Sequence, residues 1–320
     1  NEEPMNLLKE AGYNVTFYRD QFNMETFASM IPEYDVLIIG GHKFPAELME
    51  KCPHLKLICK HGAGLDNLDL AKAKELGITV TNAARTNANA VADLAFGMML
   101  NCARKISVAE RDVRAGNWHT LIGHDVYQKT LGLIGFGAIA RNMARRAAGF
   151  SMKVLAYDPF IAEVPEEFRS YVTLCADRDE VLRNCDYLSL HLQLTEETRN
   201  NISKTEMDKM RRGAVIINTS RGGIVNEGDL VEALKNGTIA GAGTDVYCNE
   251  PPKTDDPLLN CPNLIVSPHS AAQTREAVIK MAQMCVKGCL AVCQGKKWPY
   301  VADKSVYDHP IWADKAWAEV

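Results

Sequence analysis

Short apolar runs alternate with amphipathic segments along most of the chain. Runs bounded by glycine or polar residues lie at 34–40, 77–83, 187–192, 214–220, 241–246 and 264–269, and another begins at 55 and passes into a loop before 70. Continuous apolar runs of this length are typical of strands buried on both faces. Segments with helical spacing separate them, as at 176–184, 203–211 and 226–236. The alternation predicts an α/β protein with parallel sheets.

Two longer segments carry a helical pattern. One runs from 87 to the region of Gly116, with Asn87 or Asn89 as its N-cap and the glycine as its stop. The other covers about 273–294. The shorter segment at 203–211 begins with Ser203 and carries Glu206 three residues later, which is the spacing of a capping box.

A glycine turn lies within residues 130–159. An apolar run leads into Gly135-Phe136-Gly137, a helical segment follows, and a second apolar run ends at Asp158. Gly135 allows a tight turn, Gly137 lets the backbone approach a pyrophosphate, and Ala140 lets the helix pack closely on the strand. The helix N-terminus offers amides to phosphate. A carboxylate at Asp158 accepts from ribose hydroxyls and repels a 2′-phosphate, so the pattern predicts NAD rather than NADP.

The position of this turn in the middle of the chain predicts an insertion. A first α/β segment precedes the turn and does not look complete unless the last helix returns to it. We therefore expect two doubly wound parallel-sheet domains. The first contains 1–84 and 275–320, the latter with the C-terminal tail, and the nucleotide-binding domain contains 85–274.

Composition and charge exclude several classes of function. The net charge is −4 without a long basic run, so neither nucleic acid nor an anionic membrane is an expected partner. The longest apolar run, 90–100, is too short to span a bilayer and contains Asp93. No signal peptide is recognisable, and the ten cysteines are scattered without a C-x-x-C pair. We expect a cytoplasmic protein with reduced thiols and no metal site.

Three ionisable residues each follow an apolar strand. Arg221, Glu250 and His269 stand after the runs at 214–220, 241–246 and 264–269. Ligands bind at the carboxyl ends of strands in an open parallel sheet, so the three predict one site. His269 can protonate a carbonyl oxygen, and a carboxylate at Glu250 stabilises the imidazolium and fixes its tautomer. Arg221 can hold a substrate carboxylate and polarise the carbonyl. The pattern predicts hydride transfer between nicotinamide and a 2-oxo acid.

At these residues the chain resembles the D-isomer-specific 2-hydroxyacid dehydrogenases, and the resemblance covers about 35–295. The matching stretches are "HGAGLDNLD", "TLGLIGFGAIAR", "YLSLHLQLTEETRN", "VIINTSRGGIVNEGDLVEAL", "GAGTDVYCNEPP" and "VSPHSAAQTREA". The resemblance implies a Rossmann NAD-binding domain inserted into a discontinuous flavodoxin-like substrate domain. It also implies a homodimer that acts on a small 2-hydroxy or 2-oxo acid.

The resemblance assigns roles residue by residue. It implies that Arg221, Glu250 and His269 are the catalytic residues. It implies that the substrate carboxylate binds at Gly62, Ala63 and Gly64, whose small side chains leave backbone amides open to an anion. The cofactor contacts that follow from the glycine turn or the resemblance are Gly135, Gly137, Ala138, Ile139, Asp158, His191, Thr219, Ser220, Arg221, Asp245 and His269.

Within the family, the sequence motifs are most similar to those of the phosphoglycerate dehydrogenase group. We expect a short form of that enzyme, without a regulatory domain. Lys60 stands where that group often has an arginine that faces the phosphate, and lysine lacks the bidentate fork. The resemblance to this group makes 3-phosphoglycerate a candidate substrate, with Lys60 as a further substrate contact, whereas the exchange of arginine for lysine argues against a phosphate. The aromatic tail at 298–320 matches no family pattern. We expect this tail either to pack on another surface, such as that of a partner subunit, or to be disordered.

Three other functions remain open on the sequence. One is a glyoxylate or hydroxypyruvate reductase. Another is phosphonate-type oxidation of an inorganic anion. The third, from a different class, is a corepressor-like protein that senses NAD(H), since such relatives retain the three catalytic residues. A low-complexity or basic recruiting segment would favour the last, and none occurs here.

Overall fold

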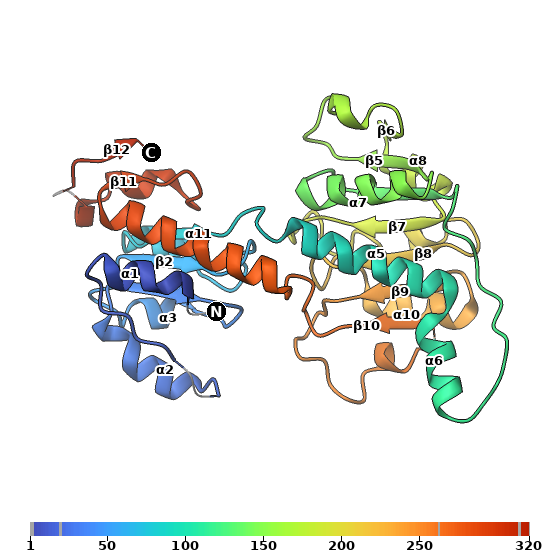
Figure 1. Ribbon diagram of the computed structural model, residues 1–320, viewed down its shortest axis with the longest axis horizontal. Helices are drawn as coiled ribbons and strands as arrows, with labels where there is room; N and C mark the ends of the chain where they lie inside the picture. Colours follow the sequence, from blue (N-terminus) through green and yellow to red (C-terminus); the bar gives the residue numbers. More distant parts are fainter. Residues whose placement is uncertain (1–2, 19–20, 262, 313–314, 320) are drawn as a thin grey trace. The chain divides into compact units, whose positions relative to one another are not determined.

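The computed structural model describes the whole chain except residues 1–2, 19–20, 262, 313–314 and 320. The chain forms two compact units, one from 1–87 together with 272–320 and the other from 88–271. Each unit is built on a parallel sheet, of three strands in the first and seven in the second (Figure 1). The predicted α/β class with two parallel-sheet domains is confirmed.

The second unit contains a doubly wound sheet. Its strands follow the order β10-β9-β8-β7-β4-β5-β6, and all neighbours are parallel. The chain starts at β4, moves outward to β6, and returns to build the other half from β7, so the strand order reverses between β4 and β7. Their bounds are β4 Thr130–Ile134, β5 Lys153–Tyr157, β6 Val172–Leu174, β7 Tyr187–Leu190, β8 Val215–Asn218, β9 Gly241–Thr244 and β10 Leu264–Val266.

Helices cover both faces of this sheet and enclose a separate apolar core on each (Figure 1). α5 (Ala88–Arg104) and α7 (Ala138–Gly149) cover one face. The other face carries α8 (Arg178–Asn184), α9 (Lys204–Met207) and α10 (Glu227–Asn236). Strands buried on both faces need apolar residues at every position, which explains their continuous apolar runs.

The prediction of a single helix from 87 to 116 is wrong at one point. The helix is interrupted at Lys105, whose φ of 55° is left-handed, and α6 (Ile106–Arg114) follows. The Asn101 side chain accepts from the Ser107 amide at 2.9 Å and donates to the Ser107 hydroxyl at 2.6 Å. This amide group therefore satisfies a first-turn donor of the new helix and stabilises the break.

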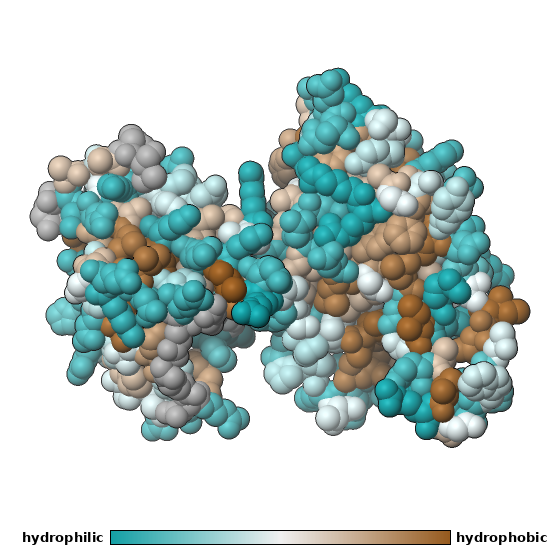
Figure 2. Space-filling model, in the orientation of Figure 1, coloured by the Kyte–Doolittle hydropathy of each residue, from teal (hydrophilic) through white to brown (hydrophobic). Residues whose placement is uncertain are grey.

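None of the residues of α6 is buried. Apolar side chains are exposed on α6 and the segment after it: Ile106, Val113, Trp118, Ile122 and Tyr127. Figure 2 shows apolar surface on the side of the unit that carries α6. A helix that buries no side chain gains little from packing within its own unit, so its apolar face is available to another surface.

The first unit is a three-stranded sheet between two helical layers. Its strands β1 (Val36–Ile39), β2 (Leu57–Lys60) and β3 (Thr79–Asn82) lie in sequence order. Along β2, Ile58 belongs to one apolar core, while Leu57 and Cys59 belong to the other, as the two-residue period of a strand requires. α2 Met24–Met30, α3 Ala46–Met49 and α4 Leu70–Glu75 supply the first core, and α1 Asn6–Glu10 and α11 Arg275–Cys293 the second.

The C-terminal tail packs on its own unit. The Trp312 indole is buried and donates to the Gly77 carbonyl at 3.0 Å, and the His309 ring contacts the Glu75 carbonyl at 3.1 Å. Of the two alternatives, a packed and a disordered tail, the described tail residues adopt the first. The short elements of the chain are β11 Lys296–Lys297, β12 Ala318–Glu319 and 3-10 turns at Glu3–Met5, Ile31–Glu33, Glu166–Phe168, Pro257–Asn260, Lys304–Asp308 and Pro310–Trp312.

Within the described ranges, no helix is both long and apolar enough to cross a membrane. The same residues contain no group of three or more His, Cys, Asp or Glu that could hold a metal ion. All ten cysteines are free thiols.

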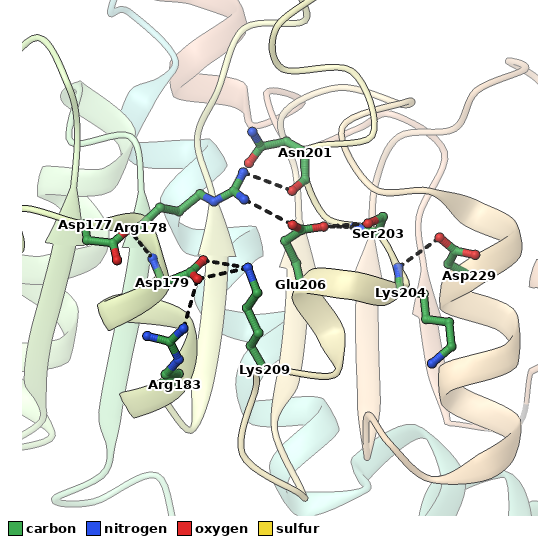
Figure 3. Close-up of polar contacts among 10 residues, drawn as sticks. All are labelled: Asp177, Arg178, Asp179, Arg183, Asn201, Ser203, Lys204, Glu206, Lys209 and Asp229. Carbon is green, nitrogen blue, oxygen red and sulfur yellow. Dashed lines mark hydrogen bonds and ion pairs between the residues drawn. The ribbon is translucent and has the colours of Figure 1, made fainter.

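A polar network ties the helices of the second unit together on one face (Figure 3). The Arg178 guanidinium at the start of α8 donates to the Glu206 carboxylate of α9 at 3.1 Å. Glu206 also accepts from the Ser203 amide at 3.1 Å and the Ser203 hydroxyl at 2.5 Å, so the predicted pairing of these two residues is confirmed. Lys204 continues the link through its amide to Asp229 of α10 at 2.9 Å.

This network keeps Glu206 ionised. Burial alone would raise the pKa of Glu206, but the hydrogen bonds from Ser203 and the charge of Arg178 outweigh it and lower the pKa from its usual 4.5. The carboxylate therefore stabilises the fold above about pH 4.5, and this contribution is lost as the pH falls through the lowered value.

Glu206→Gln should lower the free energy of unfolding at pH 7 by about 1–3 kcal/mol, the range for a charge-assisted hydrogen bond. Urea unfolding of the variant and the parent protein measures this difference, which should shrink below pH 4.5. Glu232→Gln is the matched control, because Glu232 forms an exposed pair with Lys235 at 3.4 Å and should change stability by less than about 0.5 kcal/mol. Equal effects of the two substitutions would show that the network adds nothing.

Candidate active site

The predicted cofactor and catalytic residues of the second unit gather at one edge of its sheet. Each follows the carboxyl end of a strand, and six neighbouring strands contribute in turn. These positions are Gly135 after β4, Asp158 after β5, His191 after β7, Thr219 to Arg221 after β8, Asp245 after β9 and His269 beyond β10. Parallel strands place their carboxyl ends at the same edge, so residues distant in sequence meet there.

The two glycines of the turn suit their positions for different structural reasons. Gly135 has a φ of +85°, and a Cβ there would lie 2.5 Å from the His191 carbonyl oxygen. A side chain at Gly135 would therefore push β4 and β7 apart. A Cβ on Gly137 would meet no atom within 4 Å. Gly137 thus faces open space, as expected for a position where the backbone contacts a ligand.

The N-terminus of α7 is free to bind an anion. Gly137 is its N-cap and provides no side-chain cap, and the Arg141 amide is the one that bonds to the Gly137 carbonyl, at 3.0 Å. The amides of Ala138 and Ile139 precede it and have no intrahelical acceptor. Ala140 is completely buried, so the helix lies close on the sheet. These features fit a pyrophosphate at the helix N-terminus.

Asp158 is held by the turn it faces. One carboxylate oxygen accepts from the Phe136 amide at 2.8 Å, and the other accepts from the Phe160 amide at 2.9 Å. The carboxylate is thus fixed beside the glycine turn, and each oxygen keeps a lone pair. This is the geometry in which a carboxylate can accept from ribose hydroxyls.

Two further predicted cofactor contacts, His191 and Thr219, have uncharged polar side chains. Burial lowers the pKa of His191 to about 3, so its ring is neutral near pH 7. The His191 Nε2 lies 3.0 Å from the Ser189 hydroxyl. The Thr219 hydroxyl is buried and has no hydrogen-bond partner among the described residues. An orphaned buried hydroxyl is costly, and a bound ligand would satisfy it.

The turn after β8 positions Arg221. The Asn218 side chain donates to the Arg221 carbonyl at 2.9 Å and accepts from the Ser220 amide at 3.1 Å and its hydroxyl at 2.7 Å. The Arg221 guanidinium donates to the Ser220 carbonyl at 2.6 Å. A Cβ on Gly222 would lie 1.9 Å from the Tyr247 carbonyl oxygen, so the β8 and β9 loops touch through their backbones.

Glu250 and His269 form a direct pair. The His269 Nδ1 lies 2.6 Å from one Glu250 carboxylate oxygen, and the other oxygen accepts from the Tyr247 amide at 3.0 Å. The carboxylate can therefore accept a hydrogen bond from Nδ1–H, which leaves Nε2 to face a substrate. The His269 side chain is 51% exposed, so Nε2 is accessible. The structure thus brings together the pair that the sequence predicted.

Asp245 has a role that sequence reasoning missed. It is completely buried, and its carboxylate accepts from the amides of Ser270 and Ala271 at 2.8 Å each and from the Ser267 hydroxyl. Its carbonyl accepts from the His269 amide at 2.8 Å. Asp245 therefore shapes the loop that carries His269. The sequence shows an acidic residue after a strand, but it does not show which backbone amides its carboxylate binds.

The predicted substrate residues lie in the first unit, at the end of β2 and in the loop that follows it. Lys60 is only 7% exposed, and its ammonium donates to the Gly40 carbonyl. Gly62 has a φ of +152° and its carbonyl accepts from the Ala83 amide at 2.9 Å. Within the described chain, the amides of Ala63 and Gly64 donate to no protein acceptor. Free amides in a glycine-rich loop can bind a carboxylate.

Comparisons with known proteins give a consistent result. Residues 96–271 match the model of the family described as D-isomer specific 2-hydroxyacid dehydrogenase, NAD binding domain. The chain is 38% identical to a glyoxylate reductase of Korarchaeum cryptofilum over 82% of this chain and 80% of that protein. It is 41% identical to a hydroxypyruvate reductase of Thermotoga maritima over 81% and 84% of the two chains.

Two further matches extend the comparison. A D-3-phosphoglycerate dehydrogenase of Archaeoglobus fulgidus is 35% identical over 92% of this chain and 56% of that protein. The crystal structure of the TT0316 protein from Thermus thermophilus superposes with a TM-score of 0.86 at 32% identity, covering 94% and 96% of the two chains. Together with the NAD-binding fold, these matches show that the chain is an enzyme of the NAD-dependent D-isomer-specific 2-hydroxyacid dehydrogenase family.

Proposed function

We propose that this enzyme reduces glyoxylate or hydroxypyruvate with NADH. The observation that carries the proposal is the state of Lys60, whose ammonium is buried and bound to the Gly40 carbonyl. Burial and the bond to this carbonyl leave the ammonium fewer donors for a substrate phosphate. The neighbouring His61 is held against the Val278 carbonyl at 3.3 Å, and burial lowers its pKa, so it adds no positive charge near pH 7. The similarity to glyoxylate and hydroxypyruvate reductases agrees with an unphosphorylated substrate.

The residues of the site divide the chemistry between them. The glycine turn and Asp158 would hold the cofactor, which would supply the hydride as NADH or accept it as NAD⁺. In the second unit, Arg221 polarises the 2-oxo group. In the first unit, the amides of Ala63 and Gly64 bind a substrate carboxylate. His269 donates the proton from Nε2 to the carbonyl oxygen during reduction and takes it back during oxidation. Glu250 keeps His269 in the required tautomer through its hydrogen bond to Nδ1.

A substrate panel tests the proposal. Steady-state rates with NADH should give kcat/KM for glyoxylate or hydroxypyruvate at least about tenfold above that for pyruvate and for 3-phosphohydroxypyruvate, because one or two well-placed contacts are worth that much. Lys60→Met should change KM for the phosphorylated and unphosphorylated 2-oxo acids by the same factor. A clear preference for 3-phosphohydroxypyruvate that Lys60→Met removes would instead establish the phosphoglycerate dehydrogenase alternative.

His269→Ala should lower kcat by about 10²- to 10⁴-fold, the usual range for a positioned acid–base group. The affinity for NADH, measured by fluorescence titration, should stay within about twofold, because the glycine turn is intact. Glu250→Gln keeps the shape of the pair but removes its charge, so it should lower kcat less than His269→Ala does. Near-normal turnover of the His269 variant would remove this residue from the mechanism.

We also propose that the enzyme is a homodimer that associates through residues 106–127 of the second unit. This segment carries exposed apolar side chains, with Trp118 88% and Ile122 83% exposed. Side chains of this size and exposure are typical of interfaces. A symmetric dimer would bury the same patch on both subunits.

The variant Trp118→Glu tests this surface, because a charge at the centre of an apolar interface should dissociate it. Light scattering coupled to size exclusion should give a dimer mass for the parent protein and a monomer mass for the variant. Phe160→Glu is the control, since Phe160 is 95% exposed but lies outside the segment. A monomeric parent protein, or a variant that stays dimeric, would contradict the assignment.

A further inference from the structure

The C-terminal tail extends the sheet of the first unit. β3 lies at the edge of that sheet, so one side of its backbone has no partner strand. The Ala302 amide donates to the Val80 carbonyl at 2.8 Å, and the Asn82 amide donates to the Tyr300 carbonyl at 3.3 Å. Thr81 and Val301 form an antiparallel bridge between these bonds. Residues 300–302 therefore pair with the edge strand up to its last residue.

The tail is anchored on both sides of this pairing. Before it, the Trp298 amide donates to the Tyr307 hydroxyl at 2.9 Å. After it, Asp303 forms an ion pair with Lys74 of α4 at 2.8 Å, and the Ser305 amide donates to its carboxylate at 2.8 Å. The residues that flank 300–302 are thus held by contacts within the tail and by an ion pair to α4.

The end of β3 in turn holds the loop that contains Gly62, Ala63 and Gly64. The Asn82 side chain donates from Nδ2 to the Ala63 carbonyl at 2.7 Å. The next residue, Ala83, donates its amide to the Gly62 carbonyl at 2.9 Å. The carbonyl groups of Gly62 and Ala63 therefore both accept hydrogen bonds from residues at the end of β3.

These two bonds decide where the loop amides point. A trans peptide group is planar, with its N–H opposite its carbonyl. Fixing the Gly62 carbonyl therefore sets the direction of the Ala63 N–H, and fixing the Ala63 carbonyl sets that of the Gly64 N–H. Both N–H groups point away from β3. Two donors of fixed direction are what a carboxylate with two oxygens requires.

We propose that Asn82 is a positioning residue for substrate binding and that tail residues 298–303 are the brace that holds it. The tail fixes the Asn82 backbone, the Asn82 side chain orients the Ala63–Gly64 peptide group, and that group binds the substrate carboxylate. This assignment rests on the proposed function, in which the loop at 62–64 receives the carboxylate of the 2-oxo acid.

Asn82→Ala tests the link between β3 and the loop. It should raise KM for the 2-oxo acid about 2- to 10-fold, the equivalent of one neutral hydrogen bond. The Kd of NADH should stay unchanged and kcat should change less than KM does. Asn263→Ala is the matched control, because Asn263 also donates its side-chain amide to a backbone carbonyl, that of Ala240 at 2.9 Å, outside the first unit. The control should leave KM unchanged.

Ala302→Pro tests the brace. Proline removes the amide that donates to Val80, and the variant should raise KM in the same direction. If the tail acts through Asn82, the double variant should have the KM of Asn82→Ala alone rather than the product of the two effects. Tyr307→Phe serves where the proline variant does not fold, because it removes the hydroxyl that accepts from the Trp298 amide at 2.9 Å and donates to the Trp298 carbonyl at 3.4 Å.

Hydrogen exchange gives a readout that does not depend on turnover. The amides of Gly62 and Ala83 donate within the loop and its anchor, so both should exchange faster in Asn82→Ala and in the tail variant. Unchanged exchange at these amides in both variants would overturn the inference. So would an unchanged KM for Asn82→Ala in an enzyme that reduces glyoxylate or hydroxypyruvate. An enzyme that reduces neither acid would refute the proposed function, and the exchange data would still decide whether the brace exists.

Discussion

The buried carboxylate of Asp245 is the interaction on which the catalytic geometry depends. It accepts from the amides of Ser270 and Ala271 and from the Ser267 hydroxyl, and its own carbonyl accepts from the His269 amide. Removing donors from a buried charge is costly, so the loop has little freedom to change shape. The φ of 51° at His269 is left-handed, at a cost of about 1–2 kcal/mol for a side chain of this kind. The donors to Asp245 hold the histidine in that conformation and thus beside Glu250.

Backbone contact between neighbouring loops keeps the rest of the site equally compact. Gly222 lies directly against the Tyr247 carbonyl, and Gly135 against the His191 carbonyl. Any side chain at either position would separate two loops at the carboxyl edge of the sheet. The two glycines therefore set the spacing between loops: Gly222 keeps the Arg221 turn beside the loop that leads to Glu250, and Gly135 keeps the glycine turn against the residue that follows β7.

Patterns within continuous stretches of the sequence predicted much of this arrangement. The features that the sequence did not predict depend on contacts between separate segments. The glycine turn, its helix and Asp158 form one continuous pattern, so their roles could be predicted from spacing alone. The break at Lys105 depends on the Asn101 side chain reaching Ser107, within a segment that keeps a helical pattern throughout. Strand β6 has three residues, too few for a periodic signal. Asn218 and Asp245 act by binding backbone in a turn or a neighbouring loop, which no local pattern reveals.

Both units contain backbone amides that our proposed function assigns to anion binding. In one, the amides at the N-terminus of α7 have a fixed direction because helical hydrogen bonding fixes the carbonyls of that turn, and they would face a pyrophosphate. In the other, Asn82 and Ala83 fix two carbonyls of the loop at 62–64, and its free amides follow. Recognition through backbone amides tolerates many side-chain changes. The side chains that flank the loop in this chain are Lys60 and His61, and both contact backbone carbonyls within their own unit.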